Sequence, residues 1–440
     1  MRCEAKILPC EHRAANDDSL LSSPRMTTSP GPSRDLAARR QLHELAQQSG
    51  LQVQGGSILR TSSRFCLGIE HGDYNGTELF GVGTDRFLWT WSRPNESGRV
   101  RLFSGAFAQE GVVEFAPGTV PPPGSPAHAG RWARYAFGCD WVLRRAGYRL
   151  GRGLDVVVHS DIPGGGMSRS ASLCLNLLSV MLAANGHRVD DCMQLCQLAQ
   201  SVENDYVGSP CGILDQVMIA FAREGFGTHY DPATGRVQHV PLGASAPDFR
   251  LVALDTGTVR PGLEQSTYAI RRRECEQLAA LLTEPFGIRT LAEVRDAGLH
   301  ERIQRWLGPQ RAHLGDRLRY LFEAQQHFDR MMSAWRQGDI ATVGAMFRVD
   351  GFGLRDRYRI SGPELESMCE IARTVPGVLG ERMLGGGDKG AAGAITTAAA
   401  VATLQAAVAQ EYPRRHPEYA DRFAVHELKI VDGIVTLSPE

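Results

Sequence analysis

Three short stretches of the chain carry residue types that suit phosphoryl transfer. Residues 70–73 read Glu-His-Gly-Asp and can hydrogen-bond several hydroxyl groups at once, although a polar hairpin turn at Asn75-Gly76 is an alternative. Residues 163–172 read Pro-Gly-Gly-Gly-Met-Ser-Arg-Ser-Ala-Ser. These glycines would let a backbone approach phosphate oxygens, and Ser168 and Ser170 can reach a phosphate or Mg²⁺. The stretch is not a Walker A sequence, and three glycines alone also form an ordinary turn.

The third stretch contains two acids separated by a Pro-Cys-Gly turn. Glu203 is expected on a helix and Asp215 follows the turn, so that one can bind Mg²⁺ and the other can act as a base. Two solvated surface acids are the alternative, because most Asp and Glu side chains are exposed. ATP-dependent phosphoryl transfer needs a phosphate cradle, a metal held by oxygen ligands and a positioned acceptor hydroxyl. The three stretches together offer candidates for each.

The order of these stretches resembles that of the GHMP kinases, and within them the galactokinases. The resemblance runs from about residue 55 to 430 and is specific in combination. It implies an ATP-dependent sugar-1-kinase that phosphorylates the anomeric hydroxyl of galactose or of a larger sugar with the galactose configuration. Further matching segments are Arg64, the Arg-Trp-Ala-Arg-Tyr run at 131–135, and residues 268–276, 354–361 and 382–387.

The resemblance implies a role for individual residues. Arg64 would offset charge on the transferring phosphoryl group, and Asp215 would be the general base. Mg²⁺ would be held by Ser170 and Glu203. The sugar would be bound by Glu70, His71, Asp73, Gly212 and Tyr268. ATP would be bound by Trp132 at the adenine and by Gly164, Gly165, Gly166, Ser168, Arg169 and Ser170 at the phosphates.

The implied fold is α+β, with two domains and the active site in the cleft between them. An N-terminal domain like ribosomal protein S5 domain 2 would span 35–245, and a ferredoxin-like C-terminal domain would span 246–440. Residues 1–34 are expected to form a disordered leader, with Met26 as a candidate start. A strand at 154–159, the glycine turn and a helix at 170–185 would point backbone amides and a positive helix end at an anion. Other expected elements are helices at 35–50, 131–146, 264–285 and 310–346, a β-rich region at 51–104, and strands within 227–242, 251–255 and 423–437.

Several positions depart from the galactokinase pattern. Gly72 replaces a Thr, Arg169 replaces a Ser, Asp388-Lys389 replaces Phe-Gly, and Asp350-Gly351 replaces Ser-His. Gly72 would open space beside the sugar, and Arg169 or Lys389 could pair with an extra phosphate. An octose 8-phosphate of lincosamide antibiotic biosynthesis is therefore an alternative substrate. The phosphate loop after Pro163 is one residue shorter than the galactokinase pattern. A sensor that binds ATP and sugar without transferring phosphate is therefore a further alternative.

Composition excludes several other classes of protein. The chain has 440 residues and a formal net charge of -1, so that no basic field favours nucleic acid or an anionic membrane as a partner. Its ten cysteines lack CxxC pairs, which fits a reducing cytoplasm. No stretch contains the ~18 apolar residues that span a bilayer. The expected partners are ATP and a small sugar, with the protein as a monomer or homodimer.

Overall fold

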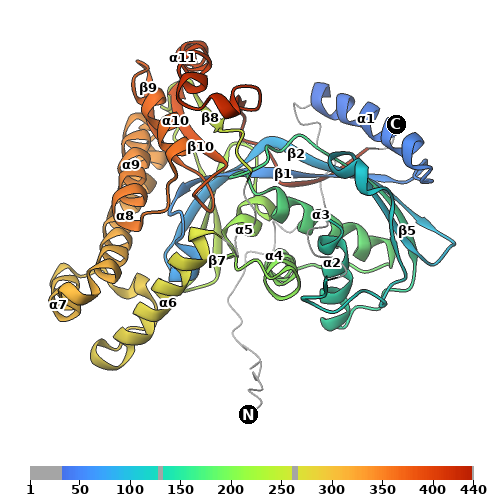
Figure 1. Cartoon of the computed structure of the whole chain (residues 1–440), viewed down its shortest axis with the longest axis horizontal. Coiled ribbons are helices and arrows are strands. Elements are labelled where there is room, and N and C mark those ends of the chain that lie inside the picture. The colour runs from blue at the N-terminus through green and yellow to red at the C-terminus, as the bar shows by residue number, and fades with distance from the viewer. Residues whose placement is uncertain (1–31, 127–131, 260–265, 439–440) are drawn as a thin grey trace.

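A computed structural model of the chain describes residues 32–126, 132–259 and 266–438 (Figure 1). Within these residues two sheets form the framework. The larger sheet has the order β12-β1-β2-β5-β3-β4, with β6 and β7 added beside β2. Its strands are β1 (Ser57–Gly68), β2 (Leu79–Asn95), β3 (Val100–Ser104), β4 (Val113–Phe115), β5 (Gly153–Ser160), β6 (Phe226–Asp231), β7 (Arg236–Pro241) and β12 (Ile434–Leu437).

Helices cover both faces of the larger sheet. In Figure 1 α1 lies against one face and the group α2 to α5 against the other. The apolar helix α3 is buried along most of its length, as expected for a helix with hydrophobic residues on nearly every side. Its buried polar side chains have partners, since Asn176 accepts the Thr90 hydroxyl at 2.6 Å and the Ser172 hydroxyl lies 2.8 Å from that of Thr61. The bounds are α1 (Pro32–Ser49), α2 (Arg134–Arg145), α3 (Arg169–Ala184), α4 (Cys192–Ser201) and α5 (Leu214–Ala220).

The smaller sheet has the antiparallel order β11-β8-β10-β9. Along the chain its strands and the helices packed on them follow a β-α-β-β-α-β sequence, which is the ferredoxin-like arrangement. The predicted α+β fold with a ferredoxin-like C-terminal part is therefore confirmed. The strands are β8 (Phe249–Asp255), β9 (Val378–Met383), β10 (Ala391–Thr397) and β11 (Ala424–Leu428), and the helices that follow β8 or β10 are α6 (Thr267–Phe286), α7 (Ala297–Leu307), α8 (Ala312–Gln337), α9 (Ile340–Gly353), α10 (Pro363–Arg373) and α11 (Val401–Arg415).

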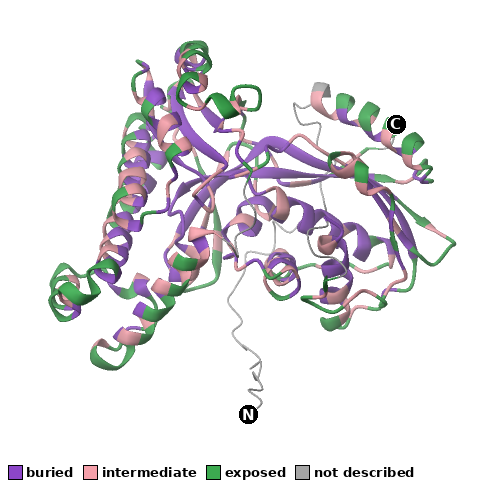
Figure 2. Cartoon of the chain, in the orientation of Figure 1, coloured by how far each residue is buried: buried purple, intermediate pink, exposed green. Residues whose placement is uncertain are grey.

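Burial follows the layers. Figure 2 shows the central strands β1 and β2 buried along most of their length, whereas α7 and the outer part of α6 are largely exposed. On β1 even polar residues such as Ser62 and Ser63 are fully buried, because helices and loops cover both faces of this strand. These buried central strands form a rigid support for the side chains that they carry toward the cavity described below.

Two boundaries differ from expectation. Helix α1 begins at Pro32, three residues before the predicted start at Asp35, while residues 1–31 of the predicted leader lie outside the described part of the chain. The predicted division at 245/246 falls between β7 and β8. The prediction assigned residues 434–437 to the C-terminal domain, but the structure pairs them with β1 of the larger sheet.

Candidate active site

One cavity of about 540 Å³ is lined by every residue to which the galactokinase resemblance assigned a catalytic or binding role. Residues 64–215 of the N-terminal part form most of its wall, and Val259, Tyr268, Gly385 and Gly386 close it from the C-terminal part. The three predicted stretches, which lie between residues 70 and 215 of the sequence, therefore meet in space. The further lining residues are Phe107, Arg134, Tyr135, Leu173, Ser209, Cys211 and Leu214.

The glycine loop at 164–166 leads directly into the start of α3. Gly166 has φ of 74° and Ser168 has φ of 58°, and a left-handed backbone is uncommon for a serine. A Cβ at Gly165 would lie 2.7 Å from Cα of Gly390, so that only glycine permits the two loops to approach this closely. The loop therefore exposes backbone amides and the positive end of α3 to the cavity, which suits an anion such as a phosphate.

Arg64 and Asp215 form an ion pair between the glycine loop and the third stretch. Nε and Nη2 of Arg64 both lie 2.8 Å from Oδ1 of Asp215. Nη1 of Arg64 donates to the carbonyl oxygen of Gly166 at 2.7 Å. Because the side chain of Arg64 is only 2% exposed, its position is fixed by these partners. The arginine thus connects the carboxylate to the loop that would hold the phosphates.

Protein groups engage both carboxylate oxygens of Glu70. Arg382 Nη1 lies 2.8 Å from Oε2, and the backbone N–H of Gly385 donates to Oε1 at 2.6 Å. Nη2 of Arg64 lies 3.7 Å from the same Oε1. Glu70 therefore holds two buried arginines and the late glycine segment in place. Its expected contact with the sugar stays a prediction.

The ion pairs continue from Arg382 to Asp350. Nε of Arg382 lies 3.2 Å from Oδ2 of Asp350, and burial raises the pKa of Asp350 to about 6. Gly351 allows this approach, because a Cβ there would press on the backbone of Glu381 and on Arg382. The two departures from the galactokinase pattern, Asp350 and Gly351, are therefore explained together: Asp350 pairs with Arg382, and Gly351 leaves room for that pairing.

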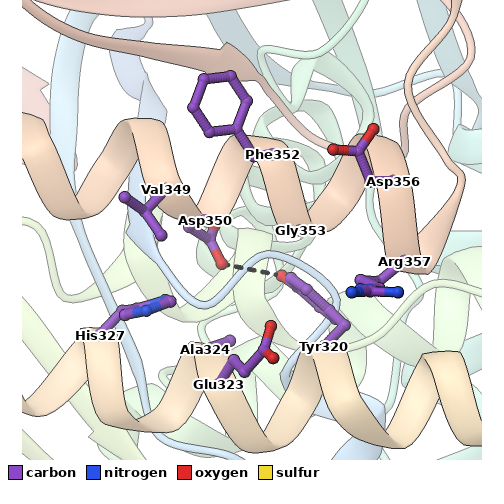
Figure 3. Close-up of a pocket in the computed structure, with 10 residues that line it drawn as sticks. All are labelled: Tyr320, Glu323, Ala324, His327, Val349, Asp350, Phe352, Gly353, Asp356 and Arg357. Atoms are coloured by element: carbon purple, nitrogen blue, oxygen red, sulfur yellow. Dashed lines mark hydrogen bonds between the residues drawn. The ribbon is translucent and has the colours of Figure 1, made fainter.

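Asp350 also lines a second cavity, of about 200 Å³, between α8 and α9 (Figure 3). Figure 3 shows Tyr320 pointing from α8 toward Asp350, and its hydroxyl donates to Asp350 at 3.2 Å. The same hydroxyl lies 3.0 Å from the carbonyl oxygen of Glu70. This cavity therefore borders the same buried charges that reach the main cavity.

The predicted sugar residues form a compact group around Asp73. Its carboxylate accepts the backbone N–H groups of Tyr74 and Leu214, each at 3.0 Å. Burial raises the pKa of Asp73 to about 6, and the nearby charge of Asp215 also raises it. A Cβ at Gly212 would collide with the Asp73 carboxylate, and the Gly212 N–H donates to the Tyr268 hydroxyl at 3.1 Å.

His71 completes this group from a left-handed backbone conformation. Its φ is 61°, which is uncommon for a histidine. The Nδ1 atom lies 3.0 Å from the hydroxyl of Tyr74, which in turn lies 2.7 Å from the hydroxyl of Tyr358. Backbone strain of this kind concentrates at functional sites. The imidazole is thus held in a defined orientation at the edge of the cavity.

Glu203 is a buried acid beside the start of α3. Burial raises the pKa of Glu203 to about 7, while hydrogen bonds from Ser170 and from Gln216 lower it. The Gln216 amide donates to Oε2 of Glu203 at 2.8 Å. The structure therefore brings together the two oxygen-bearing side chains, Ser170 and Glu203, that were predicted to hold a metal ion.

Aromatic side chains line the other end of the cavity. Trp132 is 4% exposed, and its ring stacks against that of Phe107 with centroids 6.2 Å apart. Phe107 was missed because it lies in an irregular segment with no recognisable pattern. Arg134 and Tyr135 lie in the matching run at 131–135, but the resemblance gave them no role in the site. Gly385 and Gly386 likewise lie in the matching segment at 382–387, where the Gly-Gly-Gly sequence was the signal that could have found them.

Two arguments for a larger sugar are wrong. A side chain at position 72 would point at Thr77 and Leu79, and Gly72 is buried and does not line the cavity. Glycine in place of threonine at this position therefore opens no space beside a sugar. Lys389 is not among the residues that line the cavity, whereas Arg169 is. Only Arg169 therefore remains as a candidate partner for an additional phosphate.

Comparison with known proteins agrees with this geometry. Residues 134–223 match the family described as GHMP kinases N terminal domain. A galactokinase of Exiguobacterium sibiricum is 32% identical over 350 residues, which cover 78% of this chain and 85% of the relative. A galactokinase of Streptomyces coelicolor is 32% identical over 361 residues, covering 77% and 84%. The chain belongs to the galactokinase family.

Solved structures of kinases match the fold of the chain as well. The Lactococcus lactis galactokinase complexed with galactose matches with a TM-score of 0.82 and 27% identity, over 91% of this chain and 100% of that one. The Methanococcus jannaschii mevalonate kinase, at 12% identity and a TM-score of 0.59 over 86% of this chain and 99% of that one, shows the shared fold alone. As a member of the galactokinase family, the chain is an enzyme that transfers a phosphoryl group from ATP. In the described part of the chain, no helix has the length and apolar character to cross a bilayer.

Proposed function

We propose that the protein transfers the γ-phosphoryl group of ATP to the anomeric hydroxyl of galactose. The observation that carries this proposal is the position of the Arg64–Asp215 ion pair, 2.8 Å across, between the glycine loop and the group around Asp73. Asp215 would accept the proton of the attacking hydroxyl, while Arg64 would offset charge on the transferring group. The acceptor would lie against Asp73, Gly212 and Tyr268, with His71 at its other end.

Ser170 and Glu203 would hold Mg²⁺ in this reaction. A hydroxyl and a carboxylate are the oxygen donors that a hard cation prefers. Among the described residues no group of three or more His, Cys, Asp or Glu could hold a metal ion, so that water and ATP oxygens would supply the remaining ligands. Bound there, the ion would neutralise charge on the phosphates. Trp132 and Phe107 would contact the adenine.

Two alternatives are less well supported. The hypothesis of an octose 8-phosphate substrate is no longer supported by Gly72 or Lys389, so that Arg169 is its one remaining support. A non-catalytic sensor would bind ATP and sugar without needing Arg64 and Asp215 to be paired between the two binding regions. Galactose phosphorylation explains more of the lining residues than either alternative.

A coupled assay of ADP release tests the proposal directly. We expect galactose to react well and glucose poorly, because inversion at C4 leaves one hydrogen bond to Asp73 unmade, and an unsatisfied buried polar group costs about 1–3 kcal/mol. The kcat/KM for galactose should therefore exceed that for glucose by about 5- to 150-fold. A preference for sugar phosphates would favour the octose reading, and ATP and galactose binding without turnover would favour the sensor.

A further inference from the structure

The carboxylate of Asp388 contacts the start of a helix that is far away in the sequence. Its Oδ2 accepts the backbone N–H of Thr267 at 2.7 Å, and Thr267 is the first residue of α6. The first N–H groups of a helix have no partner within the helix, and negative charge is favoured at that end. Asp388 thus caps α6 from the late glycine segment at 385–390.

The backbone of Asp388 is itself held in place. Its φ is 58°, a left-handed conformation that aspartate tolerates better than most residues. Its N–H donates to the carbonyl oxygen of Ile360 at 2.8 Å, and a Cβ at Gly362 would collide with its carbonyl oxygen. The carboxylate therefore projects from a fixed point, so that the start of α6 is fixed relative to the glycine segment.

Both segments that Asp388 connects contribute to the main cavity. Tyr268, the second residue of α6, accepts the Gly212 N–H at 3.1 Å, and Gly212 abuts Asp73. At the other end of the glycine segment, the Gly385 N–H donates to Glu70 at 2.6 Å. Tyr268 and Gly385 line the cavity, whereas Asp388 does not.

We propose that Asp388 is a positioning residue that sets the place of Tyr268 against Gly212 and thereby the affinity for the sugar. Because Asp388 does not line the cavity, its effect would be exerted through Tyr268. The proposal rests on the proposed function insofar as the ligand is a sugar. It also accounts for the departure at this position, since neither a phenylalanine nor a glycine could supply the carboxylate that caps α6.

Asp388→Gly tests the side chain alone, because glycine tolerates the left-handed backbone at this position. We expect the KM for galactose to rise about fivefold, which is the size expected for loss of one helix cap, while the KM for ATP stays within about twofold. Asp388→Asn keeps an oxygen acceptor and should restore most of the affinity. The matched control is Asp296→Ala, because Asp296 caps α7 by accepting the Leu299 N–H at 2.7 Å and does not line the cavity. This control should lower the melting temperature without changing either KM.

A double-mutant cycle identifies the route of the effect. If Asp388 acts through Tyr268, Asp388→Gly should add little to the KM of Tyr268→Phe. Full additivity of the two changes, or an unchanged KM for galactose in Asp388→Gly, would overturn the proposal.

Hydrogen exchange of the free protein separates this proposal from the proposed function. In Asp388→Gly, exchange should become about fivefold faster in peptides that cover 267–271 and 211–214. An unchanged rate at 211–214 would overturn the positioning role whatever the substrate is. Failure of the wild-type protein to phosphorylate galactose would refute the proposed function but leave this test intact.

Discussion

Arg64 contacts Asp215 through a single carboxylate oxygen, since Nε and Nη2 both lie 2.8 Å from Oδ1. Within the described residues, Oδ2 has no hydrogen-bond partner, and the Asp215 side chain is 33% exposed in the cavity. The pairing therefore orients the carboxylate and still leaves one oxygen for an acceptor hydroxyl. This geometry suits a general base that is fixed by an arginine beside the glycine loop.

We predict that Asp215→Asn lowers kcat by about 10²–10⁴-fold, which is the usual contribution of a positioned acid–base group. The amide can still accept from Arg64, so that the fold and ATP binding should be nearly unchanged. Steady-state kinetics measures the loss, and calorimetric titration with ATP serves as the control. Turnover near that of the wild type would remove Asp215 from the mechanism.

Glu203→Ala should raise the Mg²⁺ concentration needed for half-maximal activity by at least about tenfold, because loss of even an outer partner of a bound metal costs about 10–100-fold. Galactose affinity should change little. Asp205→Ala is the matched control, because Asp205 lies in the same helical turn but is exposed. If galactose binding collapses while the metal requirement stays the same, Glu203 belongs to the sugar site instead.

Asp73 should make sugar affinity depend on pH. Because burial raises the pKa of Asp73 to about 6, its ionised form, the better hydrogen-bond acceptor, is lost as the pH falls through 6. The KM for galactose should therefore rise below pH 6 and level off above it. Asp73→Asn should raise KM at every pH and abolish this dependence.

The Asp73 carboxyl also makes folding stability depend on pH, and here the change with rising pH is unfavourable, opposite to its effect on sugar affinity. The pKa of Asp73 is about 6 in the folded protein against 3.8 for the free side chain, so that the folded state binds the proton more tightly. The stability that this residue contributes is complete below about pH 4 and is lost as the pH rises through 6. Denaturation curves of the wild type and Asp73→Asn should diverge over this interval.

The KM prediction has its own contradicting outcome. A wild-type KM for galactose that is flat from pH 5 to 8 would show that Asp73 does not control sugar binding.

Gly212→Ala should weaken galactose binding, because the added methyl group would collide with the Asp73 carboxylate. A displacement of about 1 Å in a positioned group costs up to about 10²-fold in activity. We therefore expect kcat/KM to fall by about 10–100-fold while ATP binding is retained. Gly151→Ala is the control, since a Cβ there meets no atom within 4 Å. Equal activity of the two variants would exclude close contact between position 212 and Asp73.

The features that were predictable from sequence depend on local patterns. The helix at 170–185 is α3, shifted by one residue, because its apolar run and the preceding glycines are both adjacent in the chain. The residues of the site could be predicted because each belongs to a short motif whose residue types and spacing are visible in the sequence. That these stretches meet in one cavity needed the fold, since Tyr268 and Glu70 lie almost 200 residues apart.

The direction of a side chain could not be predicted in the same way. Gly72 was expected to open the sugar pocket, but the missing side chain would point at Thr77 and Leu79. Asp388 was noted only as a departure from the galactokinase pattern, whereas in the structure its carboxylate accepts a backbone N–H of α6. In both cases the outcome depends on which segment packs beside the residue, and that information is spread over the whole chain.

The pairing of β12 with β1 has a consequence for how the protein forms during translation. β1 needs β2 on one edge and β12 on the other, and β12 comes from residues 434–437. Residues 58–61 at the start of the strand that carries Arg64 therefore keep an unpaired edge on the ribosome until residues 434–437 have emerged. An exposed edge of this kind can pair with other chains. Nascent chains should thus depend on holdase chaperones until β12 is released, and a premature stop before residue 434 should send the product to aggregation rather than to a stable N-terminal fragment.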